Sequence, residues 1–319
     1  PYMDHAETDL NPRYERGTLQ EVYEMIGKDI EAGIPLIDDT AYSVPKYHFN
    51  YKAACCFASR YYLFMQDWDN AIKYATMALT SNPSSLLRDY SAIAALPNGT
   101  SRHQEYVNSA STANFLLQAA TSNSGLLFDW YSTAGRYSHG KLQGIYETVQ
   151  PKKGGPWGSS VTFKAPHAVL ASSGKYVLPR TWRVFQYTDP VAGTGFNKAI
   201  SVLFTSEEAL LNRAEAYIMK MNEDPTALDK ALEDINLYAA NLFSAGFKSM
   251  TEASIIKWAT ETYPDYSELY VGKTSVSSPQ TLNPKKKLHA APYNTLEEGS
   301  PQESICLLYT SPSPRDMRR

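Results

Sequence analysis

Two segments of the sequence carry the apolar spacing of paired helices, and they stand far apart in the chain. The first spans residues 51–81 and the second spans 205–243, and a short polar turn divides each of them. A regular solenoid of such pairs needs several consecutive units to bury a continuous core. Because residues 84–204 intervene, we predict a helical frame that carries a large irregular insertion.

The first pair resembles a tetratricopeptide hairpin. Residues 51–65 present a broad apolar face, the letters QDWD at 66–69 turn the chain, and a second helix runs to Ser81. The residues at the signature spacing of that repeat are Tyr62, Ala71, Ala78 and Pro83. Cys55 and Ala58 replace the usual Trp and Leu of the first helix, which indicates a divergent copy.

Capping boxes mark the starts of two other helices. Thr18 with Glu21, and Thr205 with Glu208, each show the Thr-x-x-Glu pattern in which two side chains satisfy free backbone N–H groups. The first box opens a helix over residues 18–32. The second opens the second hairpin, whose helices carry the letters EALLNRAEAYIMKMN and ALDKALEDINLYAANLF.

Residues 84–204 are rich in Gly, Ser, Thr, Pro, Tyr and Trp, with weak periodicity. Segments 114–120 and 176–188 are predicted to form short strands. The predicted fold class is therefore mainly α, with tetratricopeptide-like hairpins that support an irregular, loop-rich lobe with a few short strands. Loops on a rigid scaffold are where binding groups usually lie.

Composition excludes several classes of function. A net charge of −3 without a Lys/Arg stripe argues against nucleic-acid binding. No G-x-S-x-G, HExxH, Walker or Rossmann pattern occurs, and the histidines are scattered. We therefore expect no catalytic residues, no cofactor and no metal site. The sequence contains no apolar run of about 18 residues, so no transmembrane helix is predicted.

The two ends of the chain look cut. It begins at Pro1, and the letters CLLYTSPSPRDMRR at 306–319 depart from everything before them. We interpret 306–319 as a translated sequencing adapter, not native sequence, and 1–305 as a fragment of one domain. Its predicted parts are helical hairpins at about 14–83 and 205–246, a ligand lobe at 84–204 and a C-terminal part at 247–305.

The order of these segments resembles the SusD/RagB family of outer-membrane nutrient-binding lipoproteins. The letters that carry the resemblance are NPRYERGTLQEVYEMIGKDIEAGIPLI, YLFMQDWDNAIKYATMAL, LFTSEEALLNRAEAYI and LNPKKKLHAAPYNTLEEGS. The part TSEEALLNRAEAYI is the most specific. The resemblance extends from about Tyr14 to Ser304.

This resemblance implies a fold, a partner and a location. Members of the family are non-catalytic proteins with an irregular lobe that carries the ligand site. Each pairs with a SusC-like TonB-dependent transporter on the outward-facing surface of the outer membrane. The ligand is commonly an oligosaccharide and in some members a peptide. The lipid anchor, the early helices and a C-terminal segment of the family are expected to be missing here.

Sugar recognition needs flat aromatic faces beside fixed hydrogen-bonding groups. The chain contains 23 Tyr and 5 Trp. The predicted ligand-binding residues are Asp129, Trp130, Tyr131, Arg136, Tyr137 and Trp157. The alternative, that Trp130 and Trp157 fill the core of the lobe, stays open. Trp68, Trp182 and Trp258 are predicted to pack in the interior.

Other functions remain as alternatives. A peptide-binding relative of the same family would use the same aromatic loops. A cytosolic tetratricopeptide adaptor would bind a peptide of a partner protein, although the long lobe argues against this alternative. A hydrolase would need carboxylates whose separation in space the sequence does not reveal.

Overall fold

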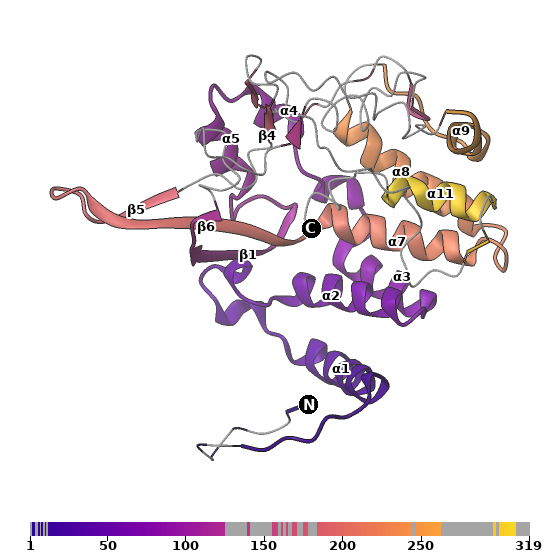
Figure 1. Ribbon diagram of the computed structural model, residues 1–319. Helices are drawn as coiled ribbons and strands as arrows, with labels where there is room; N and C mark the ends of the chain where they lie inside the picture. The colour runs from indigo at the N-terminus through magenta and orange to yellow at the C-terminus, as the bar shows by residue number, and fades with distance from the viewer. Residues whose placement is uncertain are drawn as a thin grey trace.

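The computed structural model (Figure 1) shows a helical frame from which a long β-hairpin projects. The described residues are Tyr2, Met3, Ala6, Thr8, Leu10, 12–124, 139–140, 155–158, Val161, Lys164, 168–170, 175–177, 184–243, 246–262, 296–297 and 300–310. The α-helices in this part are α1 (Leu19–Gly33), α2 (Tyr51–Phe64), α3 (Trp68–Leu79), α4 (Tyr90–Ala95), α5 (Gly99–Tyr106), α7 (Ser206–Lys220), α8 (Ala227–Leu242), α9 (Glu252–Lys257) and α11 (Pro301–Thr310).

Short 3-10 turns and one π-helical turn lie between or beside the described α-helices. The 3-10 turns are η1 (Ile34–Leu36), η2 (Asp39–Ala41), η3 (Pro45–Tyr47) and η4 (Pro83–Leu86), and η6 (Trp258–Thr262) is a π-helical turn. Pro35, Pro45 and Pro83 each stand in the first turn of a 3-10 segment, where the missing N–H has no cost. Pro83 thus follows α3 closely, as the repeat pattern predicts.

The two hairpins, far apart in sequence, form one frame. Helix α3 packs against α2 and also against α7, and α7 packs against α8 (Figure 1). Ala71, Ala75 and Ala78 of α3 are fully buried, and their small side chains let the neighbouring helices approach closely. The mainly α fold with a hairpin frame is therefore confirmed.

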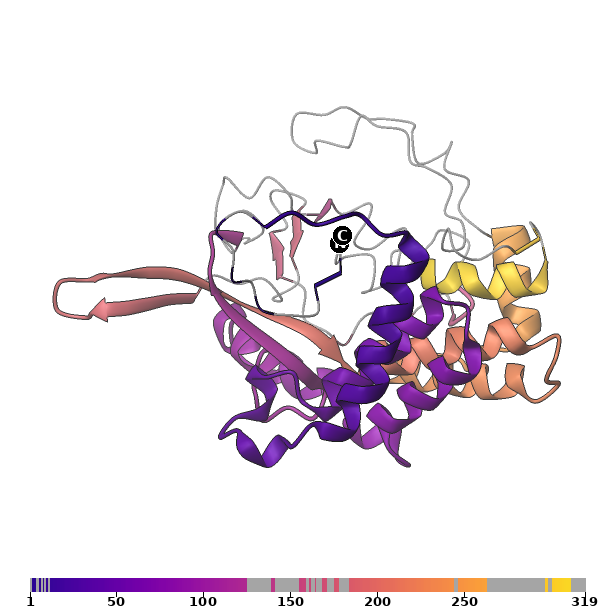
Figure 2. The same ribbon diagram turned by 90° about the horizontal axis from the view of Figure 1, so that it is seen from below.

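The caps explain where the helices begin. The Thr18 hydroxyl accepts from the Glu21 N–H and the Glu21 carboxylate accepts from the Thr18 N–H, which confirms that capping box. The Thr205 hydroxyl accepts from the Glu208 N–H at 3.1 Å, and the Glu208 carboxylate contacts Arg60 of α2. Helix α1 lies across α2 (Figure 2), where the Tyr61 hydroxyl donates to a backbone carbonyl of α1.

The strands form two small antiparallel sheets. One has the order β1 (Asn114–Thr121), β6 (Thr194–Thr205), β5 (Val184–Asp189), and the other has the order β2 (His139–Gly140), β4 (Lys175–Val177), β3 (Ala168–Leu170). Strand β1 confirms the predicted strand at 114–120. The predicted segment 176–188 is divided between β4 and β5.

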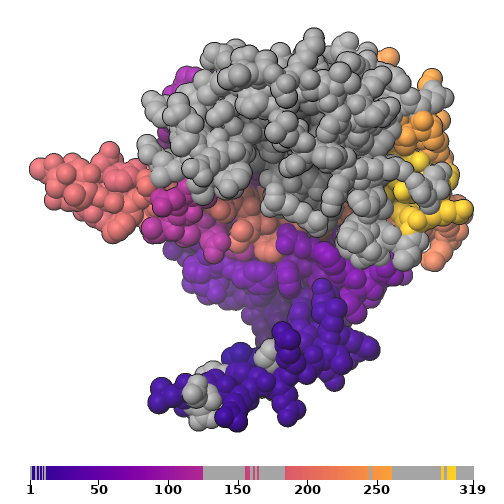
Figure 3. All heavy atoms as spheres, viewed as in Figure 1, coloured from indigo at the N-terminus to yellow at the C-terminus, as the bar shows by residue number. Residues whose placement is uncertain are grey.

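Strand β6 was not predicted, because its glycine and asparagine are typical of turns. Its first half pairs with β5 and its second half pairs with β1, so the β5–β6 hairpin projects beyond the frame (Figure 3). A side chain at Gly195 would overlap the carbonyl oxygen of Gln186 on the facing strand. The glycine is therefore needed for close strand approach.

The last described residues form a helix of the core. Helix α11 packs on α7 and α9, and Ile305 and Cys306 are buried. The start of segment 306–319 thus continues a packed helix. Residues 311–319 lie outside the described part, and the adapter origin stays a prediction. Trp68 packs against the core and Trp258 is buried, as predicted, whereas Trp182 lies outside the described residues.

A buried ion pair links α7 to α8. The Arg213 guanidinium donates twice to the Asp234 carboxylate, at 2.8 and 2.7 Å, and both side chains are nearly inaccessible. Burial raises the pKa of Asp234, and the hydrogen bonds from Arg213 oppose that rise. The pair therefore offsets part of the cost of burying the Asp234 carboxylate.

Arg213→Met should lower the free energy of unfolding by about 3 kcal/mol, because it leaves the Asp234 carboxylate buried without its partner. Urea denaturation followed by circular dichroism measures this change. The control is Lys230→Met, which removes an exposed pair with Asp224 at 3.6 Å and should cost about 0.5 kcal/mol or less. Equal losses in the two variants would contradict the prediction.

Candidate functional site

Five of the six predicted ligand residues, Asp129, Trp130, Tyr131, Arg136 and Tyr137, lie outside the described residues. Their role in binding stays a prediction.

Trp157 occupies a position in the core. Its indole is 9% exposed, stacks on Phe243 at 5.0 Å between ring centroids, and lies 6.4 Å from the Trp258 ring. A side chain at Gly155 would overlap the indole, so the glycine lets the ring fold back over the chain. The structure thus places Trp157 where the core alternative expected it, and the buried ring offers little surface to a ligand.

A different group of aromatic side chains lies on the surface, in residues 38–50, which we call the aromatic segment. Its exposed rings belong to Tyr42, Tyr47, His48 and Phe49. Tyr42 is 40% exposed and Phe49 is 49% exposed, which is unusual for large rings in a short loop. The segment connects α1 to α2 through η2 and η3.

Carboxylates hold the first half of the aromatic segment. Asp38 accepts from the backbone N–H and the hydroxyl of Thr40, and these bonds lower the pKa of Asp38. Asp39 accepts from the N–H of Tyr51, the first residue of α2, at 2.9 Å. The turn is thereby tied to the helix that follows it.

Asn50 holds the second half. Its side-chain oxygen caps α2 by accepting from the Ala53 N–H at 3.1 Å. Its amide nitrogen lies 2.6 Å from the Phe115 carbonyl oxygen of β1, and it also donates to the carbonyls of Pro45 and His48. One buried side chain therefore fixes the aromatic segment to both α2 and β1.

The rings of the aromatic segment are held in fixed geometry. Tyr42 and His48 stack face to face, with centroids 3.9 Å apart and planes inclined by 9°. Phe49 meets Phe57 and Phe204 edge-on at 6.0 and 6.2 Å. Because Tyr42, His48 and Phe49 each contact another ring, these residues present a preorganised aromatic surface to solvent.

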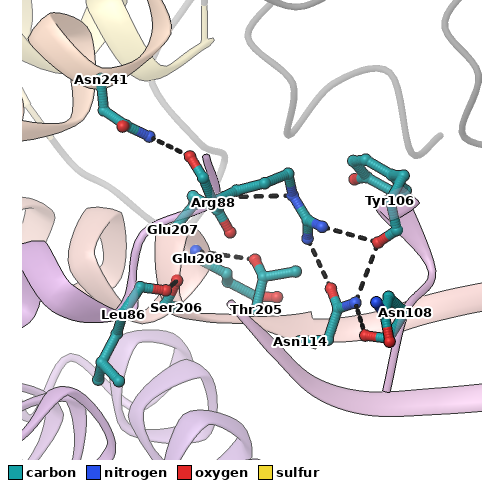
Figure 4. A network of polar contacts seen from close by, with 10 residues as sticks. All are labelled: Leu86, Arg88, Tyr106, Asn108, Asn114, Thr205, Ser206, Glu207, Glu208 and Asn241. Atoms are coloured by element: carbon teal, nitrogen blue, oxygen red, sulfur yellow. Dashed lines mark hydrogen bonds and ion pairs between the residues drawn. The ribbon is translucent and has the colours of Figure 1, made fainter. Parts of the chain in front are cut away.

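A buried polar network centres on Arg88 (Figure 4). Its guanidinium donates to the Tyr106 carbonyl and to the Asn114 side chain, at 2.7 and 2.6 Å, and forms an ion pair with Glu207. The Asn241 side chain donates to the Arg88 carbonyl. The network thus connects four elements: α5, the start of β1, α7 and α8. Strand β1 is also the strand to which the Asn50 side chain ties the aromatic segment.

Two lysines lie within or beside the aromatic segment. Lys46 donates to the Ser111 carbonyl, and burial, with repulsion from Lys52 and Arg88, lowers the pKa of Lys46 to about 8. The Lys52 ammonium lies 5.7 Å from the centroid of the Phe115 ring, and burial also lowers its pKa. Each lysine is therefore held by a contact with the chain around β1.

Two kinds of feature are absent from the described residues, a cluster of metal ligands and a membrane-spanning helix. Among those residues no three or more His, Cys, Asp or Glu side chains gather as a metal site. No described helix has both the length and the apolar character needed to cross a membrane.

The aromatic segment is not among the binding residues predicted from the sequence. Three aromatic residues and a histidine fall within positions 42–49, and Pro45 interrupts any helical pattern there. That density of rings in a short loop was the available signal. Exposure, which separates a binding surface from a packed turn, depends on the neighbouring α2 and β1.

Asn50→Asp should destabilise the protein by about 2 kcal/mol at pH 7. The exchange keeps the helix cap, but it removes the amide donor and points a carboxylate at carbonyl oxygens. Thermal and urea denaturation measure the loss. The reverse exchange at another N-cap, Asp67→Asn in front of α3, should change stability by about 0.5 kcal/mol or less, because either residue caps well. A neutral Asn50→Asp would contradict the anchoring role.

The stability difference between the protein and its Lys46→Met variant should depend on pH. The folded pKa of Lys46 is about 8 and its ordinary value is 10.5, so the unfolded state binds more protons between these values. Stability of the protein relative to the variant should therefore rise as the pH increases from 8 to 10.5. Urea denaturation at pH 7, 9 and 10.5 tests this, and a constant or falling difference would contradict it.

Comparisons with known proteins find a family that resembles the first part of the chain. Residues 1–63, which contain the aromatic segment, match the SusD-like family model described as "Starch-binding associating with outer membrane". None of the curated proteins matches the chain.

Three solved structures from Bacteroides are similar to the chain. A SusD-like protein of Bacteroides fragilis NCTC 9343 is 12% identical, with a TM-score of 0.47 over 76% of this chain and 56% of that one. A SusD superfamily protein of Bacteroides vulgatus ATCC 8482 is 17% identical, with a TM-score of 0.43 over 78% and 53%. A SusD-like carbohydrate binding protein of the same strain is 19% identical, with a TM-score of 0.42 over 72% and 44%.

The chain spans about half the length of these structures. The match to the family model covers residues 1–63 of the 319 residues. On this match, residues 1–63 of the chain are similar to the SusD-like family.

Proposed function

We propose that this protein binds oligosaccharides at the outward-facing surface of the outer membrane and delivers them, without catalysis, to a SusC-like TonB-dependent transporter. The observation that carries the proposal is the aromatic segment: preorganised, exposed rings within the residues that match a family described as starch-binding. The outer-membrane location is supported by the same description. The lipid anchor and the transporter are expectations that follow from the family.

The chemistry of the aromatic segment suits a pyranose. The C–H groups on one face of a sugar ring pack favourably on an aromatic face, and hydroxyls need nearby hydrogen-bonding groups. The segment offers the rings of Tyr42, Tyr47 and Phe49 beside the hydroxyl of Ser43 and the carboxylate of Asp38. Because the backbone bonds of Asp39 and Asn50 hold the loop, binding costs little ordering of the chain.

The residues predicted from the sequence remain part of the proposal. Trp130 and Tyr131, with Asp129, Arg136 and Tyr137 nearby in the chain, carry the same chemistry in the lobe. A glycan chain of several sugars would occupy more than one aromatic surface. The lobe residues and the aromatic segment would then act as separate subsites.

Tyr42→Ala and Phe49→Ala should each weaken glycan binding about threefold to tenfold, because each removes one aromatic contact of roughly 0.5–1.5 kcal/mol. Isothermal titration with a glycan that a glycan array identifies measures the change, with soluble starch as the first probe. The matched control is Tyr187→Ala, which removes an exposed ring from the projecting β5–β6 hairpin and should leave the affinity unchanged.

Two outcomes would overturn the proposed function. Binding of peptides, without binding of any glycan on the array, would favour the peptide-binding relatives. Release of reducing ends from a polysaccharide during incubation would contradict a non-catalytic role. Loss of affinity in Tyr187→Ala, with Tyr42→Ala and Phe49→Ala unchanged, would move the sugar site from the aromatic segment to the hairpin.

A further inference from the structure

We propose that strand β5 pairs with β5 of a second copy of this chain, so that the two projecting β5–β6 hairpins form one continuous sheet across a two-fold axis. The inference goes beyond the proposed function and does not depend on it. It concerns the outer edge of the hairpin, whereas glycan binding is proposed for the aromatic segment and the lobe.

The projecting part of the sheet has two strands among the described residues (Figure 1, Figure 3). Strand β6 pairs with β1 over residues 198–205 and with β5 over residues 194–198. A two-stranded ribbon is marginally stable in water, and a third strand is usually needed to stabilise it. The hairpin is nevertheless well formed at its turn, because the Asp189 carboxylate accepts from the N–H groups of Val191 and Ala192, at 2.9 and 3.0 Å.

The outer edge of β5 presents backbone groups to a further strand. The carbonyl oxygen of Gln186 points at β6, because a side chain at Gly195 of β6 would overlap it. Successive residues of a strand direct their peptide groups to opposite edges, so Phe185 and Tyr187 direct theirs to the outer edge. No described backbone hydrogen bond outside the sheets involves either residue. This edge therefore offers two N–H donors and two carbonyl acceptors to a partner.

The same edge lacks the features that usually protect an exposed strand from pairing. Residues 184–188 contain no Lys, no Pro and no other charged side chain, and the register shift between β5 and β6 comes only after Tyr187. The rings are exposed, with 58% of Tyr187 and 38% of Phe185 accessible to solvent. A regular, uncharged and apolar edge of this kind pairs readily with another strand.

The edge is complementary to itself in one antiparallel register. When Gln186 of each copy lies on the two-fold axis, Phe185 of each copy faces Tyr187 of the other. Four backbone hydrogen bonds then form, because each of these residues offers both its N–H and its C=O. On the opposite face the two Gln186 amides meet, and each amide can donate and accept.

This register also continues an aromatic contact that each copy already has. Phe185 and Tyr187 lie on one face of β5 and meet edge-on, with ring centroids 4.9 Å apart and planes inclined by 76°. In the dimer, the two rings of one copy lie opposite the two rings of the other as cross-strand Phe–Tyr pairs. Such aromatic pairs stabilise antiparallel sheets.

Charge complementarity favours a second copy in the antiparallel direction. Asp189 ends β5 at the tip of the hairpin, and Lys198 pairs with Val184 at the opposite end. Antiparallel pairing brings Asp189 of each copy to the end at which the other copy carries Lys198, about two strand spacings or roughly 10 Å away. Opposite charges at this separation attract at low salt. A parallel pair would instead bring the two Asp189 carboxylates together.

The contact is small, which sets the strength of the dimer. Pairing over residues 184–188 of each copy buries less than the roughly 1,200 Å² of a stable interface. We therefore expect a concentration-dependent dimer with a dissociation constant on the order of 10–100 µM. The interface is isologous, so the association closes at two copies.

Sedimentation equilibrium of the full chain tests the inference. Between about 5 and 500 µM, the average mass should rise from near 35.6 kDa towards twice that value. Tyr187→Pro should raise the dissociation constant about tenfold or more, because proline removes the outward N–H yet is tolerated on an edge strand. The matched control is Leu36→Ala, which removes an exposed apolar side chain of η1 and should leave the mass profile unchanged.

A charge exchange at the two-fold axis tests the register. Gln186→Lys and Gln186→Glu should each weaken the dimer about tenfold, because like charges then lie directly opposite each other. An equimolar mixture of these two variants should associate at least as tightly as the unchanged protein, since opposite charges meet across the axis. Circular dichroism and cooperative urea unfolding verify that each variant folds.

Three results would overturn the inference, and each leaves the proposed glycan binding in place. The first is a mass that stays near 35.6 kDa over the whole concentration range. The second is a dimer that Tyr187→Pro leaves unchanged or that Leu36→Ala weakens equally, because the interface would then lie elsewhere. The third is a mixture of the two Gln186 variants that associates no better than either variant alone.

Discussion

The buried guanidinium of Arg88 is the interaction on which the rest of the arrangement depends. It is 2% exposed, it binds the Tyr106 carbonyl and the Asn114 side chain, and it pairs with Glu207 of α7. A charge this deep in a protein is tolerated only when it is paired and hydrogen-bonded. Tyr106 and Asn114 belong to the predicted lobe, and Glu207 belongs to the helical frame. The network therefore fixes the position of these two parts of the chain relative to each other (Figure 4).

The aromatic segment depends on the Arg88 network indirectly, through strand β1. Asn114 of the network begins β1, and the next residue, Phe115, offers the carbonyl to which Asn50 donates. Asn50 in turn caps α2 and holds Pro45 and His48. Buried hydrogen bonds therefore fix the loop that carries the exposed rings. Such rigidity favours binding because little conformational freedom is lost when a ligand binds.

Prediction from the sequence succeeded where the signal is local. The capping box at Thr18, the helix over Tyr51–Phe64 and the strand from Asn114 were all predicted within a residue or two of their observed bounds. It failed at β6, where Gly195 indicated a turn but serves a close approach of strands. It also failed to select the aromatic segment, since a ring in a loop is equally compatible with packing and with exposure.

The sequence by itself determined the helical hairpins and their caps, because helical periodicity and capping residues are properties of nearby residues. Only the tertiary structure decided that Trp157 lies in the core and that Tyr42 and Phe49 lie outside it. Burial and charge pairing depend on which distant segments meet, and here Arg88 and Asn50 bring those segments together.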